Sequence, residues 1–140
     1  MTERVIRSAL GALAAASMVS GVWASVSPRG FYDDFPGGGR QWVAVDGPYN
    51  EHLVRDFGAL NLALTVVTLV ALVTLARAAV LAAAGAWIAY SVPHLIHHIR
   101  HVDVYDTTDK VAAIGSLVLA LVLPAVVLLA ELRRPPGREV

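Results

Sequence analysis

Four of the five histidines of the chain lie within one short segment, SVPHLIHHIRH. They are His94, His97, His98 and His101, spaced i, i+3, i+4 and i+7. Because each residue of an α-helix advances by about 100°, a helix would place all four rings within an arc of about 100°. Neutral imidazole is the most common metal ligand in proteins that offer no thiols, and it suits Zn, Cu and Fe. The segment therefore predicts a transition-metal site on one helix face.

A single helix cannot surround a metal ion, so other segments must complete its ligand shell. An i, i+4 pair such as His94 and His98 can share one ion. The segment PYNEHLVRD offers further ligands at the same end of the chain's apolar runs, namely Glu51, His52 and Asp56. Side chains that would hold the ligands in place by hydrogen bonds, without binding the metal, are Tyr90, Asp103, Asp106 and Asp109. A histidine and carboxylate set without sulfur is typical of Zn, Fe or Cu(II) sites.

Other interpretations of the same residues stay open. Asp106 and Asp109 have the spacing of an N-cap and a first-turn acid of a helix. The four histidines could form a hydrated or pH-responsive interfacial face that binds no metal. A haem b could be held between one of these histidines and His52, with Trp87 and Tyr90 beside the ring. The chain could also be a non-catalytic accessory subunit of a larger membrane complex, packed through its small residues.

The composition bounds the class of protein. Of the 140 residues, 56% are hydrophobic and 16% are charged, and the mean hydropathy is +0.61. Soluble domains carry about 25% charged residues. The formal net charge is zero, so nothing points to nucleic acid as a partner, and the absence of cysteine excludes disulfides and thiolate metal sites. These values predict an integral membrane protein with the lipid bilayer as its main partner, alone, as a homo-oligomer or in a larger complex.

Four membrane-spanning helices account for the apolar runs. The middle run covers about 47 residues, or about 70 Å as one helix, which is too long for a bilayer core of about 30 Å. It must fold back, and its isolated charge predicts a tight turn at Arg77–Ala79. The chain is then one all-α transmembrane domain over residues 1–140, a four-helix bundle. Its helices are expected at about 5–26, 53–76, 79–101 and 109–132, with a long outer loop at 27–52.

The first helix and the topology rest on charge. Residues 1–25 resemble a secretory signal peptide, but their apolar run of about 20 residues favours a retained helix. Short segments carrying Arg4, Arg7, Arg77, Arg133, Arg134 and Arg138 would face the cytoplasm by the positive-inside rule. This predicts a multi-pass protein of the plasma membrane, with both termini in the cytoplasm and the histidines at the outer end.

Three local features carry further expectations. The aromatic residues of the loop would form either a belt at the lipid headgroups or a lid over the bundle. The PGGG segment is predicted to be a flexible turn. Within the helices, Pro124 leaves the carbonyl of Ala120 without its helical partner, and Asn61 is expected to form a hydrogen bond between helices.

Three resemblances add to this picture. The segment HLIHH resembles the HxxHH box of membrane desaturases and alkane hydroxylases, which implies iron as the metal. Over the whole chain, the four-helix layout and the sequence Arg55-Asp56-Phe57-Gly58 are similar to small DoxX-like membrane proteins. The segments SPRGFYDDFPGGG and GPYNEHLVRDFGALNLAL also resemble uncharacterised actinobacterial membrane proteins. The DoxX-like resemblance implies the fold and the membrane location, because that family has no assigned activity.

Overall fold

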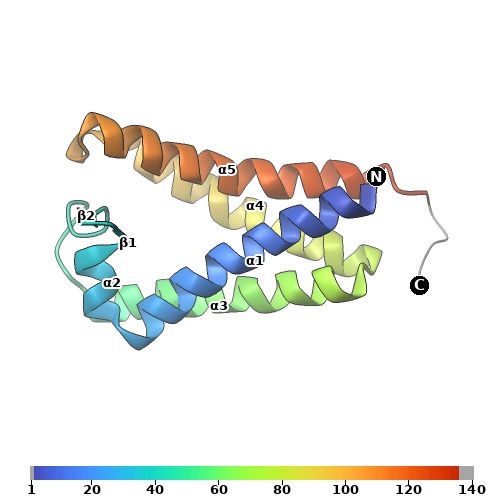
Figure 1. Cartoon of the computed structure of the whole chain (residues 1–140), viewed down its shortest axis with the longest axis horizontal. Coiled ribbons are helices and arrows are strands. Elements are labelled where there is room, and N and C mark those ends of the chain that lie inside the picture. The colour runs from blue at the N-terminus through green and yellow to red at the C-terminus, as the bar shows by residue number, and fades with distance from the viewer. Residues whose placement is uncertain (1, 136–140) are drawn as a thin grey trace.

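Four long apolar helices run side by side through the molecule (Figure 1). A computed structural model describes residues 2–135, and its long helices are α1 (Thr2–Val26), α3 (Glu51–Thr74), α4 (Arg77–Arg100) and α5 (Thr107–Leu132). Each is long and apolar enough to cross a bilayer. The prediction of an all-α, four-helix membrane bundle is confirmed, and each helix lies close to its predicted range.

The outer surface of the bundle is apolar. Val19, Val73 and Val111 are 64%, 75% and 72% exposed, and they belong to three different helices. In water so much contiguous apolar surface would drive association, whereas lipid tails cover it without cost. The chain is therefore a multi-pass integral membrane protein.

The turn between α3 and α4 lies at Leu75 and Ala76, just before the predicted position at Arg77–Ala79. Leu75 takes a left-handed conformation with φ 49°, and its N–H donates to the Ala71 carbonyl at 2.9 Å. Its own carbonyl accepts a hydrogen bond from Arg134 Nη2 at 2.8 Å. The prediction placed the turn at the charge, but this left-handed cap ends α3 first, so the arginine begins α4.

Two glycines bring α1 and α3 into backbone contact. A Cβ atom built on Gly58 would lie 2.5 Å from Ser25 Oγ and 3.1 Å from the Gly21 carbonyl oxygen. Arg55 Nη1 also donates to the Ser25 carbonyl at 2.6 Å, which joins the start of α3 to the end of α1. The Arg55-to-Gly58 sequence thus has a packing role, and α1 is an integral part of the bundle.

One end of the bundle is solidly filled. Small and medium apolar side chains from all four helices form its core, which includes Ile6, Leu10, Ala71, Ala83 and Val127. Three arginines close it by donating to carbonyls of neighbouring helices: Arg7 to Leu72, Arg77 to Glu131 and Arg134 to Leu75. We call this the arginine end.

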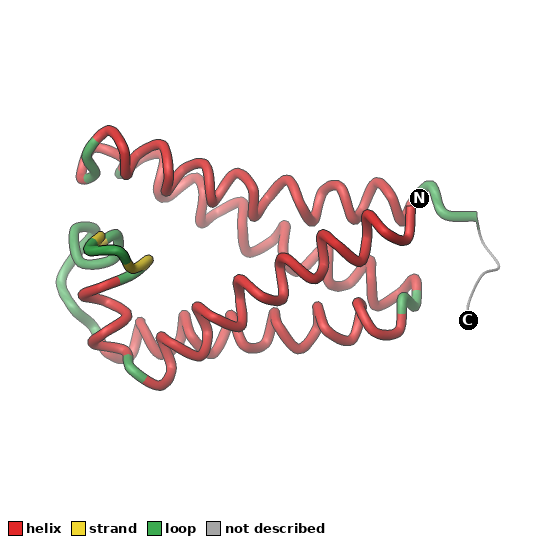
Figure 2. The backbone as a smooth tube through the Cα atoms, viewed as in Figure 1, coloured by secondary structure: helices red, strands yellow, loops and turns green. Residues whose placement is uncertain are grey.

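The opposite end, which carries the histidines, is more open. The pair α1–α3 and the pair α4–α5 diverge towards it, so that their far ends lie well apart (Figure 2). Residues 27–50, which we call the cap, fill part of the space between them (Figure 1). We call this the histidine end.

The cap has more structure than the predicted loop at 27–52. It contains helix α2 (Pro28–Asp34) and a short antiparallel pair, β1 (Pro36–Gly37) and β2 (Arg40–Gln41). Within the PGGG segment, Gly38 and Gly39 form the turn of this pair, and all three glycines have φ between 67° and 102°, which glycine adopts at little cost. Phe31 is 2% exposed and packs with Phe35 and Phe57 at ring-centroid distances of 4.6 and 5.3 Å. The cap aromatics therefore pack inwards as a lid.

Candidate ligand cavity

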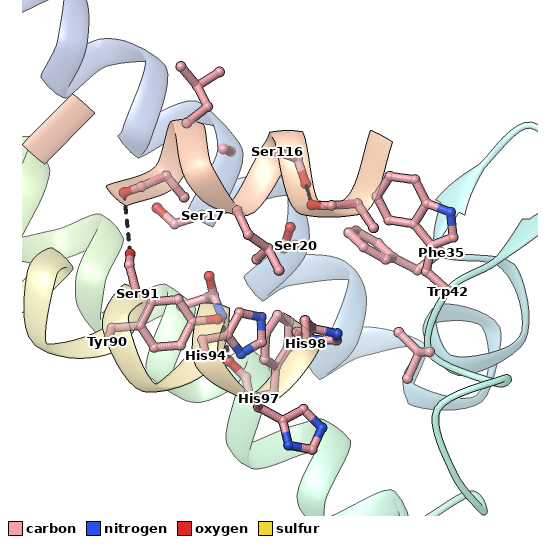
Figure 3. Close-up of a pocket in the computed structure, with 18 of the residues that line it drawn as sticks. Ser17, Ser20, Phe35, Trp42, Tyr90, Ser91, His94, His97, His98 and Ser116 are labelled. Atoms are coloured by element: carbon pink, nitrogen blue, oxygen red, sulfur yellow. Dashed lines mark hydrogen bonds between the residues drawn. The ribbon is translucent and has the colours of Figure 1, made fainter. Parts of the chain in front are cut away.

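A cavity of about 600 Å³ lies inside the histidine end, between the four long helices and beneath the cap (Figure 3). Most of its wall is apolar, formed by side chains such as Leu13, Val54, Leu117 and Leu123. Polar groups expose the smaller part of the wall, and they belong to Ser17, Ser20, Asp46, Asn61, Tyr90, Ser91, His94, His97, His98, Tyr105 and Ser116. An apolar cavity with a few placed polar groups is the usual form of a small-molecule site.

The cavity is closed towards the arginine end. Leu13, Leu64 and Trp87 pack together at its deep side, and Trp87 Nε1 donates to Thr68 Oγ1 at 2.8 Å. Ser17 Oγ and Thr65 Oγ1 are hydrogen-bonded at 2.7 Å between α1 and α3. The filled core of the arginine end follows. The cavity is therefore blind, and it does not form a pore through the bundle.

His94 is the deepest of the histidines. Its ring stacks between Tyr90, at a centroid distance of 5.2 Å, and Phe57, at 6.4 Å. The His98 ring lies 4.8 Å away, one helical turn nearer the cap. The predicted i, i+4 pair His94/His98 therefore lies on the cavity wall (Figure 3).

Tyr105 and the cap orient His98. The Tyr105 hydroxyl donates to the Trp42 carbonyl oxygen at 3.0 Å and lies 3.4 Å from His98 Nδ1. Because its single proton goes to the carbonyl, the hydroxyl can only accept from His98. This order assigns the His98 proton to Nδ1 and leaves the Nε2 lone pair as an acceptor or metal ligand.

Tyr105 lies between α4 and α5, and its hydroxyl stays protonated over a wide pH range. Burial raises the pKa of Tyr105 to about 12, and the nearby Asp46 carboxylate acts in the same direction. Both causes disfavour the phenolate. The hydroxyl therefore remains a donor to the cap wherever the protein functions.

The two outer histidines lie differently. His97 Nε2 is 3.3 Å from Asp46 Oδ2, a cap carboxylate on the cavity rim, and the His97 side chain is half-exposed. His101 Nδ1 is 2.8 Å from the His97 carbonyl, and His101 does not line the cavity. The predicted row of four rings is thus divided between the wall, the rim and the outside.

The remaining predicted ligands lie away from the cavity. Glu51 pairs with Arg55 at 2.9 Å, and His52 pairs with Asp56 at 3.3 Å, with the His52 side chain 86% exposed. None of Glu51, His52 and Asp56 lines the cavity. His52 is therefore not placed to share a haem with His94 across it.

The acidic residues after α4 have local partners. Asp103 pairs with Lys110 at 3.2 Å. The Asp106 side chain accepts from the Asp109 N–H at 2.8 Å, so Asp106 is the N-cap of α5, as the capping interpretation expects. Asp109 forms an ion pair with Arg40 of the cap. These carboxylates fix the cap and the start of α5 and do not face His94 or His98.

Within residues 2–135, no three histidine or acidic side chains are grouped so that they could hold a metal ion. His94 and His98 together supply two ligands on one side of the cavity. Any metal held there would need its other positions filled from elsewhere, by water or by a bound molecule.

Several site residues were not predicted. Asp46, Tyr105 and Trp42 belong to irregular segments, where no periodicity indicates which side chain turns inwards. Phe57 lies in an apolar membrane helix, where nothing in the sequence distinguishes it from the other apolar residues. Asp46 and Trp42 belong to the cap, Phe57 to α3 and Tyr105 to the segment after α4, so only the tertiary fold brings the four residues to the histidines.

Two polar groups within the membrane-spanning helices, the Ala120 carbonyl and the Asn61 side chain, have partners in the structure. The Ser91 hydroxyl donates to the Ala120 carbonyl at 3.2 Å, and this is the carbonyl that Pro124 deprives of its helical partner. The bond joins α4 to α5 in the cavity wall (Figure 3). The Asn61 side chain donates to the Phe57 carbonyl of its own helix at 2.9 Å, and it also interacts with the Tyr90 hydroxyl of α4, in line with the expected bond between helices. Asn61 also lines the cavity.

Comparison of the chain with protein-family models, with curated proteins and with solved structures found no match. The function of the cavity must therefore be argued from its own geometry.

Proposed function

We propose that this membrane protein binds a small amphipathic molecule in the cavity, with a hydrogen-bonding group at His94 and His98 and an apolar body directed towards Trp87. The observation that carries the proposal is the separation of polar and apolar lining groups within one cavity of about 600 Å³. The imidazoles are near the cap, and the walls below them are mainly apolar. Such a volume lies within the range of about 300–1,000 Å³ typical of ligand sites.

The charges of the cavity favour an uncharged ligand. Among the described residues that line it there is no lysine or arginine, and the single carboxylate, Asp46, is paired with His97. An anionic head would find no permanent countercharge, and burying an unpaired charge is expensive. A hydroxyl group matches His98, because it can donate to the Nε2 lone pair, and a hydroxyl or carbonyl oxygen can accept from the N–H of His94.

The depth of the site sets the length of the ligand. His98 and Trp87 are eleven positions apart on one helix, which corresponds to about 16 Å. This is about the length of an extended chain of twelve carbon atoms. A dodecanol whose head meets His98 would therefore bring its last carbon near the Trp87 indole.

Tryptophan fluorescence tests the proposal directly. In a Trp23→Phe/Trp42→Phe background, Trp87 is the remaining emitter. Dodecanol brominated at its terminal carbon should quench this emission saturably in detergent micelles. His98→Leu should weaken binding by about 0.5–1.5 kcal/mol, the value of one hydrogen bond.

The matched control is His101→Leu, because His101 lies on the same helix but outside the cavity. It should leave binding unchanged. Quenching that never saturates, or that falls equally in both variants, would show that the alcohol dissolves in the micelle and does not bind the protein.

A transition metal is the second candidate occupant, and the closeness of the His94 and His98 rings favours it. We propose Zn, Cu or Fe, bound by these two histidines and by groups of a bound molecule. Metal analysis of protein purified without a chelator or a histidine tag tests this. About one metal per chain, lost in His94→Leu/His98→Leu but kept in His101→Leu, would support it.

The same sample tests the haem alternative. A Soret absorbance band that is lost with His94 or His98 would indicate haem b. Metal-free protein without such a band would leave the organic ligand as the occupant and the histidines as hydrogen-bonding groups.

A further inference from the structure

We infer that the ligand enters the cavity sideways from the lipid, through a gap between α1 and α5, and is therefore a neutral lipid with an alkyl or isoprenoid chain. This inference rests on the proposed function, since it concerns how the same cavity is filled. It follows from a comparison of the four seams where neighbouring helices meet around the cavity.

Three of the seams are closed by specific contacts beside the cavity. Hydrogen-bonded Ser17 and Thr65 close the α1–α3 seam. Trp87 bonds to Thr68, and the Phe57 and His94 rings stack, across the α3–α4 seam. The Ser91 bond to the Ala120 carbonyl closes the α4–α5 seam.

The α1–α5 seam has no such contact. No side-chain hydrogen bond or aromatic contact joins these two helices within the described residues. The helices lie together near the arginine end and diverge towards the histidine end (Figures 1 and 2). Ala12 and Ala16 face the cavity from α1, and Ser116 and Leu119 face it from α5, yet all four are exposed.

The residues of α1 that line the α1–α5 seam have short side chains. Ala12, Ala16 and Ser20 follow one another at i, i+4 and i+8, so they share one face of α1. Their side chains are too short to reach across to α5. On the other three seams the same place is occupied by paired hydroxyls, by aromatic rings or by a hydroxyl bonded to a carbonyl.

The depth of the gap identifies the source of the ligand. Ala16 is the fifteenth residue of a 25-residue helix, and Leu119 is the thirteenth of 26. Both therefore lie near the middle of helices that span the bilayer, beside lipid chains and far from water. A molecule that passes between them must already be dissolved in the membrane.

The alternative route, through the cap, is held closed by specific contacts. Arg40 of β2 is paired with Asp109 of α5, and Tyr105 holds the Trp42 carbonyl. Phe35 and Trp42 cover the cavity beneath these bonds (Figure 3). Entry from water would require these contacts to open, whereas entry through the gap breaks no hydrogen bond within the described residues.

The rate at which a lipid probe reaches Trp87 distinguishes the two routes. The protein, in the Trp23→Phe/Trp42→Phe background, is placed in phosphatidylcholine vesicles. These are mixed rapidly with vesicles that carry dodecanol brominated at its terminal carbon. Ala16→Phe, which fills the gap, should slow the quenching of Trp87 by about tenfold or more, equivalent to a modest added barrier.

Ala15→Phe is the matched control, because Ala15 is exposed on the same helix but does not line the cavity. It should quench at the rate of the unmodified background. Arg40→Ala, which releases the cap, should also leave the rate unchanged if the gap is the route.

Each failure has its own signature. Quenching at an unchanged rate in Ala16→Phe, together with acceleration in Arg40→Ala, would overturn lateral entry and leave the binding proposal intact. Unsaturable quenching in the background protein would overturn the binding proposal itself. Equal slowing in Ala16→Phe and Ala15→Phe would also overturn lateral entry, because the effect would then be independent of the gap.

Discussion

The two ends of the bundle are made by the same four helices, but they are filled differently. At the arginine end, small apolar side chains from every helix meet, and arginines bond to the carbonyls of neighbouring helices. At the histidine end the helices diverge around a cavity of about 600 Å³. Close packing gains dispersion energy that a cavity forgoes, so the filled end contributes more to the stability of the fold than the hollow end.

The polar groups of the two ends differ in the same way. At the arginine end, Glu131 is fully buried with Arg134 Nη2 3.0 Å away, and Arg77 is nearby at 3.9 Å. These charges therefore pair with one another inside the protein. At the histidine end, the His98 Nε2 lone pair and the ring of His94 face a space that the protein leaves unfilled. This contrast agrees with the proposal that the histidine end binds a ligand, whereas the charged groups of the arginine end pair with one another.

The largest effect that would break this contrast is the loss of the buried carboxylate. Glu131→Leu leaves Arg134, whose side chain is 10% exposed, without its countercharge. We expect destabilisation by about 3–5 kcal/mol, since removing one partner leaves the other charge buried without a countercharge. The thermal unfolding midpoint in detergent micelles measures it.

The matched variant at the other end is His94→Leu. It replaces a side chain that packs on a cavity wall by one of similar size, and we expect a loss of at most about 1.5 kcal/mol. If His94→Leu proved as destabilising as Glu131→Leu, the histidine end would be structural, and the contrast between the ends would be wrong.

A smaller effect is expected where α1 and α3 meet. Gly58→Ala would place a methyl group 2.5 Å from Ser25 Oγ and 2.9 Å from the Ser25 backbone nitrogen, so the helices must separate. We expect a cost of about 1–3 kcal/mol, typical of overpacking. Chemical unfolding in mixed micelles, monitored by helical circular dichroism, gives the value.

Gly85→Ala is the control, because a Cβ atom there meets nothing within 4 Å. Alanine is the better helix former, so this variant should be neutral or more stable by up to about 1 kcal/mol. Equal losses in the two variants would mean that helix propensity, and not contact between α1 and α3, determines the effect.

The sequence predicted what depends on hydropathy and much less of what depends on the cap. The number, class and approximate bounds of the helices follow from apolar length, since a bilayer demands about 20 residues per crossing. The position of the α3–α4 turn could not be predicted in this way, because Leu75 takes a left-handed conformation that leucine rarely adopts.

The candidate site was predicted only along one helix. Periodicity correctly groups His94 and His98 on a shared face, because that relation is local. It cannot show that His101 turns outwards or that Asp46 reaches His97, since both depend on how residues 27–50 fold over the bundle. Glu51, His52 and Asp56 were predicted as ligands because they lie at the same end of the bundle as the histidines. They face away from the cavity, because α3 presents a different side to it.

The smallest expected effect concerns the contact between Tyr105 and the cap. The pKa of Tyr105 is raised to about 12, against about 10 for an exposed tyrosine, because its burial and the Asp46 carboxylate disfavour the phenolate. The folded protein holds this proton more tightly than the unfolded chain. The resulting stabilisation is complete below about pH 10 and is lost as the pH rises towards 12.

At about pH 11 the native protein and Tyr105→Phe should therefore show the same tyrosinate absorbance, whereas after unfolding the unmodified chain should show one tyrosinate more. Ultraviolet difference spectra of the two proteins in micelles, before and after denaturant is added, measure this. An extra tyrosinate already present in the native protein would mean that water reaches Tyr105. The cap would then be open at the histidine end, and the hydroxyl could not fix the His98 proton on Nδ1.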